Sequence, residues 1–216
     1  DKTEHSSWMN DDGWVLKLNT IFNQVSGTVF HDANSNGVYD TGENPIPYRH
    51  VSETGSGVFT YTDFDGDYIL QVSDTGILTI EPLLENIYWN PIPAQHAIPF
   101  SDFNNVESFR DFAFQSSGVY DDLCLEATPS GPFRPGFNGG YIVECSNEGT
   151  TTQNATLIFY PDNGLNFQGS SPAATIVTQD SIVIDLGMME PFQHEYIYLN
   201  FSIDLSIPLG STLLSS

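Results

Sequence analysis

The sequence predicts an all-β protein built from two tandem β-sandwich domains behind an extended N-terminal segment. Apolar and polar residues alternate with a period of two in many short runs, as they do in strands that bury one face. Asn-Gly and Asp-Gly pairs, which tolerate the positive φ of tight turns, separate these runs. With 39% hydrophobic and 13% aromatic residues, the 216-residue chain has enough apolar material for packed cores despite its acidity.

The expected strands fall into two sets, separated by the small, polar stretch 115–118 (QSSG). We place the domain boundary there, which gives an N-terminal extension (1–23), a first sandwich (24–115), a linker (116–118) and a second sandwich (119–216). The first set is Ser26–His31, His50–Thr54, Val58–Thr62, Asp67–Val72, Ile77–Pro82 and Ser108–Phe114. The second set is Leu123–Ala127, Tyr141–Cys145, Ala155–Tyr160, Thr175–Thr178, Ser181–Leu186 and Tyr196–Leu205.

The charge balance excludes several classes of partner. The chain carries 28 Asp and Glu against 5 Lys and Arg, a formal net charge of −23. A nucleic-acid backbone needs clustered cations, and an anionic membrane surface attracts polybasic segments, so we expect neither partner. No apolar run approaches the roughly 20 residues that span a bilayer, so we expect no membrane insertion.

The composition also bears on where the protein works. Residues 1–4 lack the basic and apolar regions of a signal peptide, which leaves either a cytosolic protein or a processed one. Few lysines and many Asn, Ser, Thr and Gly favour an oxidising, calcium-rich exterior. We therefore expect an extracellular or bacterial cell-surface location.

The most specific motif is DANSNGVYDTGE, residues 32–43. Oxygen-bearing side chains occupy loop positions 1, 3, 5, 9 and 12, a glycine makes the sharp turn at position 6, and position 7 offers its backbone carbonyl. Because Ca²⁺ takes six to eight oxygens at about 2.3–2.6 Å, we expect this loop to bind one Ca²⁺. The expected ligands are Asp32, Asn34, Asn36, Val38, Asp40 and Glu43.

This loop is expected to lie on a β-domain and not between two helices. Ser26–His31, before the loop, alternates like a strand. Pro45 and Pro47, after it, prevent an exiting helix.

A second acidic cluster follows in TDFDGDY, residues 62–68. Its carboxylates belong to Asp63, Asp65 and Asp67. They could complete the first site or hold another ion, or the segment could be an ordinary hairpin turn with solvated aspartates.

The order SGTVFHDANSNGVYDTGENPIP, then a short strand, then TDFDGDYIL, resembles the calcium-binding B-type repeat of Cna-B/SdrD-like bacterial surface proteins. The resemblance covers about residues 24–115 and implies a prealbumin-like sandwich with its metal ligands on the loop. Many Cna-B relatives also form a Lys–Asn isopeptide bond from a lysine in the first strand, but Ser26–His31 contains no lysine. We therefore expect no isopeptide bond, and Ca²⁺ as the stabiliser in its place.

The second half is similar to the Ig-like modules that follow such repeats in Bacteroidota proteins exported by the type IX system. The elements of this similarity are RPGF, a strand ending in N-x-G, an LxF hairpin and the turn LGMMEPF. It covers residues 119–216 and implies an Ig-like sandwich. Residues 1–23, with DDGWVLKLN, resemble the last strand of a preceding repeat, which would make the chain part of a longer polypeptide.

Two cysteines lie in the second domain. If the strands that contain them are antiparallel neighbours, with Ala127 opposite Ile142, then Cys124 lies opposite Cys145 at a separation that a disulfide accepts. Closing this loop would stabilise the domain by about 3 kcal/mol. We therefore predict a Cys124–Cys145 disulfide, with two free buried thiols as the alternative.

The sequence contains no catalytic constellation with a mechanism behind it. The five histidines lack metalloprotease spacing, and neither a Gly-x-Ser-x-Gly elbow nor a Gly-rich phosphate loop occurs. A glycosidase-like carboxylate pair is defined by spatial separation, which the sequence does not give. The aromatic stretch Tyr88–Pro91 could stack on sugars, or pack in a core or a domain interface. We expect a protein that is not an enzyme.

These features predict a structural or adhesion module, a Ca²⁺-rigidified stalk of a larger bacterial surface protein. Two other classes stay open: a self-assembling extracellular filament subunit joined by β-strand addition, and an accessory carbohydrate-binding region of a secreted enzyme. The filament hypothesis rests on residues 13–21 (GWVLKLNTI), whose alternation suits an added strand. The expected partners are accordingly adjacent domains or like subunits, and surface glycans.

Overall fold

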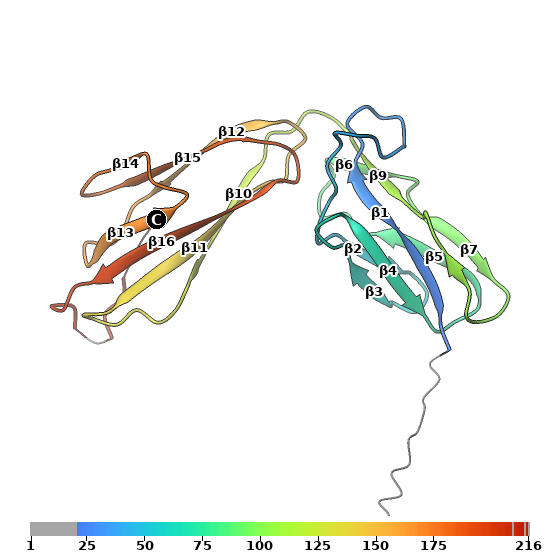
Figure 1. The fold of residues 1–216 in the computed structure, drawn as a ribbon, viewed down its shortest axis with the longest axis horizontal. Coiled ribbons are helices and arrows are strands. Elements are labelled where there is room, and N and C mark those ends of the chain that lie inside the picture. Colours follow the sequence, from blue (N-terminus) through green and yellow to red (C-terminus); the bar gives the residue numbers. More distant parts are fainter. Residues whose placement is uncertain (1–20, 209, 214, 216) are drawn as a thin grey trace, which may run out of the picture.

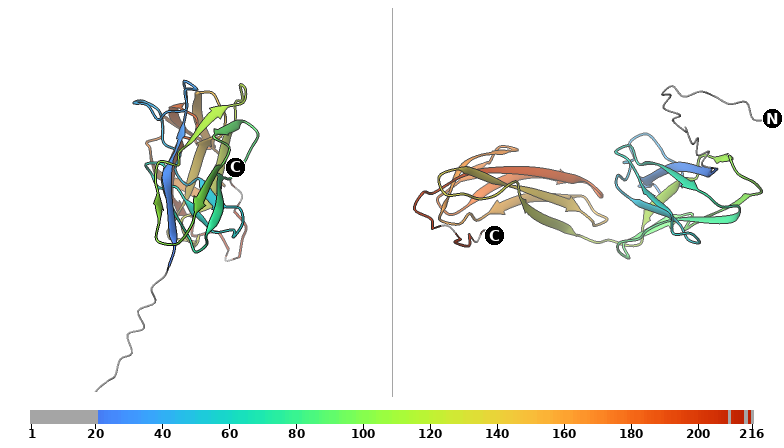
Figure 2. Two further views of the ribbon diagram at one scale, coloured as in Figure 1. Left: turned by 90° about the vertical axis from the view of Figure 1, so that its right-hand side faces the viewer. Right: turned by 90° about the horizontal axis from the view of Figure 1, so that it is seen from below.

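The computed structural model describes residues 21–208, 210–213 and 215, and these residues fold entirely as strands and connecting loops (Figure 1). The strands of residues 23–116 form two sheets around one hydrophobic core, and those of residues 123–203 form two sheets around another. The predicted fold class, two tandem β-sandwiches, is confirmed. Figure 2 shows the two sandwiches as separate bodies that follow one another along the chain.

No helix with the length and apolar character to cross a membrane is present in the described part of the chain.

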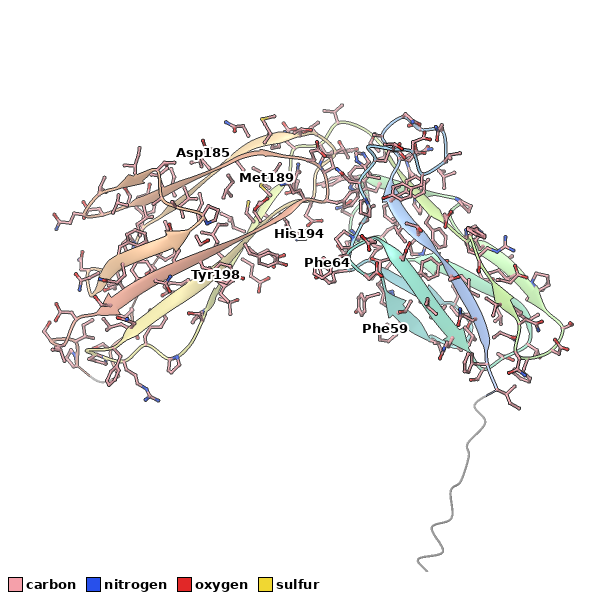
Figure 3. The ribbon with its side chains drawn as sticks, viewed as in Figure 1. Phe59, Phe64, Asp185, Met189, His194 and Tyr198 are labelled. Atoms are coloured by element: carbon pink, nitrogen blue, oxygen red, sulfur yellow. The ribbon has the colours of Figure 1, made fainter. Side chains whose placement is uncertain are left out.

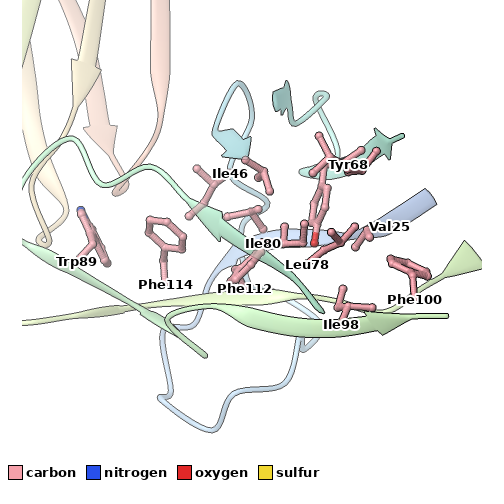
Figure 4. Packing of buried hydrophobic residues seen from close by; sticks show 14 of the residues in the cluster. Val25, Ile46, Tyr68, Leu78, Ile80, Trp89, Ile98, Phe100, Phe112 and Phe114 are labelled. Carbon is pink, nitrogen blue, oxygen red and sulfur yellow. The ribbon is translucent and has the colours of Figure 1, made fainter. Parts of the chain in front are cut away.

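The first sandwich has sheets of strand order β4-β1-β9-β6, with β8 beside β1, and β3-β2-β5-β7. Its strands are β1 (Asn23–His31), β2 (His50–Glu53), β3 (Phe59–Tyr61), β4 (Asp67–Val72), β5 (Gly76–Pro82), β6 (Trp89–Ile92), β7 (His96–Phe100), β8 (Val106–Glu107) and β9 (Phe112–Ser116). Strand β4 illustrates why the sheets face each other: Tyr68, Leu70 and Val72 alternate into the core and the residues between them face water. Figure 4 shows this core, including Val25, Tyr68 and Ile80.

The second sandwich has sheets of order β10-β11-β16-β13 and β12-β15-β14. Its strands are β10 (Leu123–Pro129), β11 (Asn138–Asn147), β12 (Gln153–Phe159), β13 (Leu165–Ser171), β14 (Ile176–Val177), β15 (Ile182–Met189) and β16 (His194–Ile203). Its central strand, β16, buries Ile197, Leu199, Phe201 and Ile203 at every second position. The four-stranded sheet therefore faces a sheet with only three strands in this part of the chain.

Four strands, β6, β7, β8 and β13, are not predicted by the sequence pattern. Pro91 in β6 and Pro99 in β7 interrupt the alternation, but both strands lie at sheet edges, where a residue without an N–H is tolerated. Strand β13 is also an edge strand, with an irregularity between Phe167 and Gly169, and β8 has only two residues.

The expected strand Ser108–Phe114 is wrong in its first half. Regular pairing begins only at Phe112. Phe109 has a φ of 61° and is 87% exposed. It is therefore not part of a strand, and its apolar side chain fits the alternating pattern by chance.

The predicted disulfide is also wrong, because the register of β10 on β11 differs by one residue from the expected one. Cys124 pairs with Ser146, and Leu125 pairs with Cys145. Neighbouring positions along a strand point to opposite faces, so the Cys145 side chain is buried while Cys124 is exposed, and both thiols are free.

We expect the intact protein to show no loss of two hydrogens for a disulfide and no loss of ammonia for an isopeptide bond. A thiol reagent should modify Cys124 in the native protein and Cys145 only after unfolding. Burial, with the charges of Asp122 and Glu148, raises the pKa of the Cys124 thiol, so its labelling should be slow at neutral pH and accelerate as pH rises. Equal labelling of both thiols in the native state would contradict the observed register.

Candidate calcium loop and domain junction

The candidate calcium loop, residues 32–43, lies at the end of the first sandwich that meets the second. Strand β1 ends at His31, directly before the loop, and the chain returns to β1 at Pro45, which forms a bridge with Phe30. His31 lies 6.0 Å from Phe192 of the second sandwich, measured between ring centroids. The loop is therefore anchored on one domain and borders the other.

Asp32 is the buried centre of this loop. Only 2% of its surface is exposed. One carboxylate oxygen accepts the backbone N–H of Asn36 at 3.1 Å, and the other accepts the N–H of Gly37 at 2.8 Å and the Gln115 amide at 2.7 Å. Burial alone would raise the pKa of Asp32, but the hydrogen bonds from Gln115 and the loop backbone outweigh it and lower that pKa. Asp32 is thus held as a carboxylate.

The other expected side-chain ligands are linked to one another around Asp32. Asp40 Oδ2 accepts the amide of Asn34 at 3.0 Å and the amide of Asn36 at 2.7 Å. The two carboxylate oxygens of Glu43 accept the N–H of Ala33 at 3.0 Å and the N–H of Asp40 at 3.1 Å. These bonds link Asn34 and Asn36 to Asp40 and tie Glu43 to the loop backbone, but they do not gather the three carboxylates of the loop into one group.

The backbone of the loop has the shape that the spacing predicts. Gly37, at position 6, has a φ of 77°, and Ser35 has a φ of 60°. The side-chain oxygen of Asn36 accepts the N–H of Val38 at 2.7 Å, which folds the chain tightly at this point. An L-residue at position 37 would be strained in this left-handed conformation.

The chemistry of this set fits a hard cation: three carboxylates and two amides on one loop. No group of three or more His, Cys, Asp or Glu side chains at metal-binding spacing is found among residues 21–208, 210–213 and 215. Two of the five expected side-chain ligands, Asn34 and Asn36, are amides, and their NH₂ groups donate hydrogen bonds to the carboxylate of Asp40. The amide oxygens already accept N–H groups of the loop, Asn34 from Asn36 and Asn36 from Val38, so Ca²⁺ would have to compete with these bonds to be held by all five side chains.

The second acidic cluster lies in the turn that joins β3, in one sheet of the first sandwich, to β4, in the other. One oxygen of Asp63 accepts the N–H groups of Asp65 and Asp67, each at 3.0 Å. Asp67 accepts a hydrogen bond from Thr28 on β1. The three carboxylates are therefore used separately, two of them by the turn and its neighbouring strand, and the structure does not bring them together around one point.

Sequence reasoning gave packing in a core or a domain interface as one role for Tyr88–Pro91, but it missed the residue of the second sandwich that docks there. Phe192, in the turn between β15 and β16, is only 6% exposed and belongs to the core cluster of the first sandwich. Its ring lies 4.3 Å from that of Trp89, and the Arg49 guanidinium lies 5.6 Å from its centroid. The EPF sequence of this turn was the only local signal, and it gives no hint of a docking site more than 100 residues away.

Three further contacts cross the junction. Tyr88 and Tyr120 stack with ring centroids 4.4 Å apart. Trp89 Nε1 donates to the carbonyl of Glu148 at 3.3 Å, and the Asn44 amide donates to the Glu190 carboxylate. Trp89 is 3% exposed, so its ring is used in packing between domains and is not available for stacking on a sugar.

Comparisons with known proteins give weak similarities. No family model matches this chain, and no curated protein matches it. Among solved structures, BcpA, the major pilin subunit of Bacillus cereus, is similar with a TM-score of 0.36 and 13% identity over 90% of this chain and 62% of that chain. A DUF3823 family protein from Bacteroides ovatus gives 0.31 and 12% over 90% and 87%. The major pilin SpaD from Corynebacterium diphtheriae gives 0.29 and 13% over 82% and 56%.

This chain thus spans less than two thirds of the length of either pilin. TM-scores this low establish neither family membership nor a shared function.

Proposed function

We propose that this protein is a non-enzymatic structural module of the bacterial exterior, in which Ca²⁺ held by residues 32–43 stiffens the first sandwich and its junction with the second. One observation supports this most directly: both ends of the loop touch the second domain. His31 precedes the loop and packs against Trp89 and Phe192. Asn44 follows the loop and bonds to Glu190.

Electrostatics supports the same proposal. Asp32, Asp40 and Glu43 lie on one loop of a chain with a net charge of −23, so their mutual repulsion disfavours the compact loop. Ca²⁺ would supply positive charge at this point. The five side chains would then hold the loop in one conformation, and with it the positions of His31 and Asn44 against the second domain.

The range of affinities for extracellular calcium modules, about 10⁻⁴–10⁻³ M, fits a role outside the cell. A site in this range would be loaded at millimolar Ca²⁺ and empty at cytosolic levels. The stiffness of the junction would then develop only after export.

Thermal unfolding of the full chain tests the proposal. With 1 mM free Ca²⁺ and an affinity near 10⁻⁴ M, binding stabilises by about 1.4 kcal/mol, which corresponds to a rise in Tm of about 5 °C over the chelated protein. The double variant Asp32→Ala, Glu43→Ala should lose this difference. The matched control Glu126→Ala, Asp180→Ala removes one Glu and one Asp from exposed positions of the second sandwich and should keep it.

An unfolding curve that is identical in Ca²⁺ and in excess chelator would refute the metal site. A Ca²⁺ effect that persists in the Asp32→Ala, Glu43→Ala variant would place the ion elsewhere in the molecule.

A further inference from the structure

The second sandwich is open along one side. Its four-stranded sheet ends in β10, and all seven residues of that strand are exposed, although strands of a sandwich normally bury one face. β10 is the longest strand in the described chain without a single buried or half-buried residue.

The exposed side chains of β10 include those that point to the interior. Leu125 pairs with Cys145 and Ala127 pairs with Val143. Residues directly opposite in an antiparallel pair share one face of the sheet, and Cys145 and Val143 are 4% and 2% exposed in the second core. Leu125 lies on this core face and is nevertheless 61% exposed.

The cause is a missing neighbour in the opposite sheet. That sheet ends at β12, which packs over β11: Phe159 of β12 lies 5.3 Å from Tyr141 of β11. In the described part of the chain β12 pairs only with β15, so half of its backbone N–H and C=O groups face outward. One further strand beside β12 would both pair with these groups and cover the core face of β10.

We propose that this open side is the acceptor for an extended segment, residues 13–21, of a second copy of the chain. The segment would pair with the free edge of β12 and lay its apolar side chains on Leu123, Leu125 and Ala127. This goes beyond the proposed Ca²⁺-stiffened module, because it gives the module a way to assemble.

The sequence of the segment matches the acceptor in spacing and charge. Trp14, Leu16 and Leu18 recur at every second position, as do the three exposed residues on the core face of β10. Lys17, between them, would face outward beside β12, and Asp185 of β15, one strand further into the sheet, also projects away from the sandwich interior (Figure 3). A lysine is favourable on a chain with 28 acidic residues.

The segment cannot fill the acceptor of its own chain. The nine residues of β1 span about 26 Å, and it is the His31 end that lies at the junction, so Asn23 lies at the far end of the first sandwich (Figure 1). β10 begins at the junction and runs away from it. Leu18 is five residues before Asn23 and can reach at most about 18 Å from it.

An intermolecular contact between two different surfaces leaves a free segment and a free acceptor at the ends of each oligomer, so it propagates unless the rotation between copies closes a ring. Each copy would offer a segment to one neighbour and an acceptor to another, which generates open-ended filaments. Strand addition of this kind takes its affinity from main-chain hydrogen bonds and its specificity from alternate side chains.

Sedimentation velocity of the full chain in Ca²⁺, from about 10 μM to about 1 mM, tests the proposal. The wild type should form a concentration-dependent series of oligomers. The acceptor variant Leu125→Asp and the donor variant Leu16→Asp, Leu18→Asp should each weaken association at least tenfold. The control Leu84→Asp changes a 45% exposed leucine of the first sandwich and should assemble like the wild type.

Mixing the two defective variants separates strand addition from general stickiness. The acceptor variant keeps an intact segment and the donor variant keeps an intact acceptor, so the mixture should form one-to-one dimers and nothing longer. Because Leu125 is exposed in the single chain, its replacement should leave the unfolding curve of the monomer unchanged. Leu125→Ser provides a milder acceptor variant if the aspartate lowers stability.

A wild type that stays monomeric up to 1 mM, variants that assemble as the wild type does, or a mixture without dimers would each overturn the proposal. The Ca²⁺ dependence of thermal unfolding is measured separately, so a failure of assembly leaves the proposed calcium site standing.

Discussion

Replacing Phe192 with alanine is expected to lower the free energy of unfolding of the first sandwich by about 3 kcal/mol, although the residue belongs to the second. Its ring is 6% exposed and is surrounded by Trp89, His31, Phe114 and the Arg49 guanidinium. Removing it leaves a cavity at the end of the first core and exposes Trp89. Denaturant unfolding followed by tryptophan fluorescence would measure the loss.

Two further variants separate the ring from the backbone at this position. Phe192 has a φ of 64°, a left-handed conformation that costs a residue with a Cβ about 1 kcal/mol relative to glycine. Phe192→Gly should therefore be more stable than Phe192→Ala by about that amount, while still losing the ring. Phe109→Ala, at an 87% exposed position, should change stability by less than about 0.5 kcal/mol.

Phe192→Ala should also loosen the contact between the two domains. Small-angle scattering of Phe192→Ala should report a broader distribution of interdomain distances than that of the wild type. If the alanine variant matches the wild type in both stability and scattering, the aromatic contact does not hold the junction.

The strands that the sequence predicts well are those whose alternation is set by a single buried face. Strand β4 is predicted without error because Tyr68, Leu70 and Val72 all pack inward and its turn is fixed by Gly66. Strands β6 and β7 are not predicted because each contains a proline, which a strand tolerates only at the edge of a sheet. Whether a strand lies at an edge is decided by the assembled sheet and cannot be seen in the local sequence.

Register and long-range packing are less accessible to sequence reasoning. Moving β10 by one residue on β11 changes the partner of Cys124 from Cys145 to Ser146. Alternation alone does not distinguish the two registers, because each strand has an apolar residue on both faces: Cys124 next to Leu125 in β10, and Ile142 next to Val143 in β11. The docking of Phe192 on Trp89 joins residues 103 positions apart. Nothing in either local sequence specifies the partner.

The candidate calcium loop lies between these extremes. Its spacing predicts a set of ligands within one short segment, and the structure gives this segment its own network of hydrogen bonds; the binding of Ca²⁺ by it stays a prediction. Gln115, which donates to Asp32 from β9, could not be found in this way, because it is 83 residues further along the chain.

Acidification is expected to destabilise the first sandwich through Glu53, which lies at the end of β2 and is only 4% exposed. Its carboxylate accepts the N–H of Gly55 at 2.9 Å, and the N–H and hydroxyl of Ser56 at 2.5 and 2.7 Å. Burial alone would raise the pKa of Glu53, but the bonds from Ser56 and Gly55 outweigh it, so the pKa is lowered in the folded protein.

The sign of the pH dependence follows from this direction. A glutamate has a pKa of about 4.3 in the unfolded chain, so the contribution of Glu53 to stability is fully present above that pH. It is lost as pH falls from there through the lower pKa of the folded state, because protonation removes the charge that these three hydrogen bonds stabilise.

The difference in unfolding free energy between the wild type and Glu53→Ala isolates this group from the other carboxylates. At neutral pH we expect Glu53→Ala to be less stable by about 3 kcal/mol, since it leaves the turn donors without their charged acceptor. Below about pH 4 this difference should shrink, because the wild type loses the same interaction by protonation. Glu126→Ala, at an exposed position of β10, should show no such difference at any pH. A difference for Glu53→Ala that stays constant between about pH 7 and pH 3 would mean that the packing of the side chain, and not its charge, holds the turn.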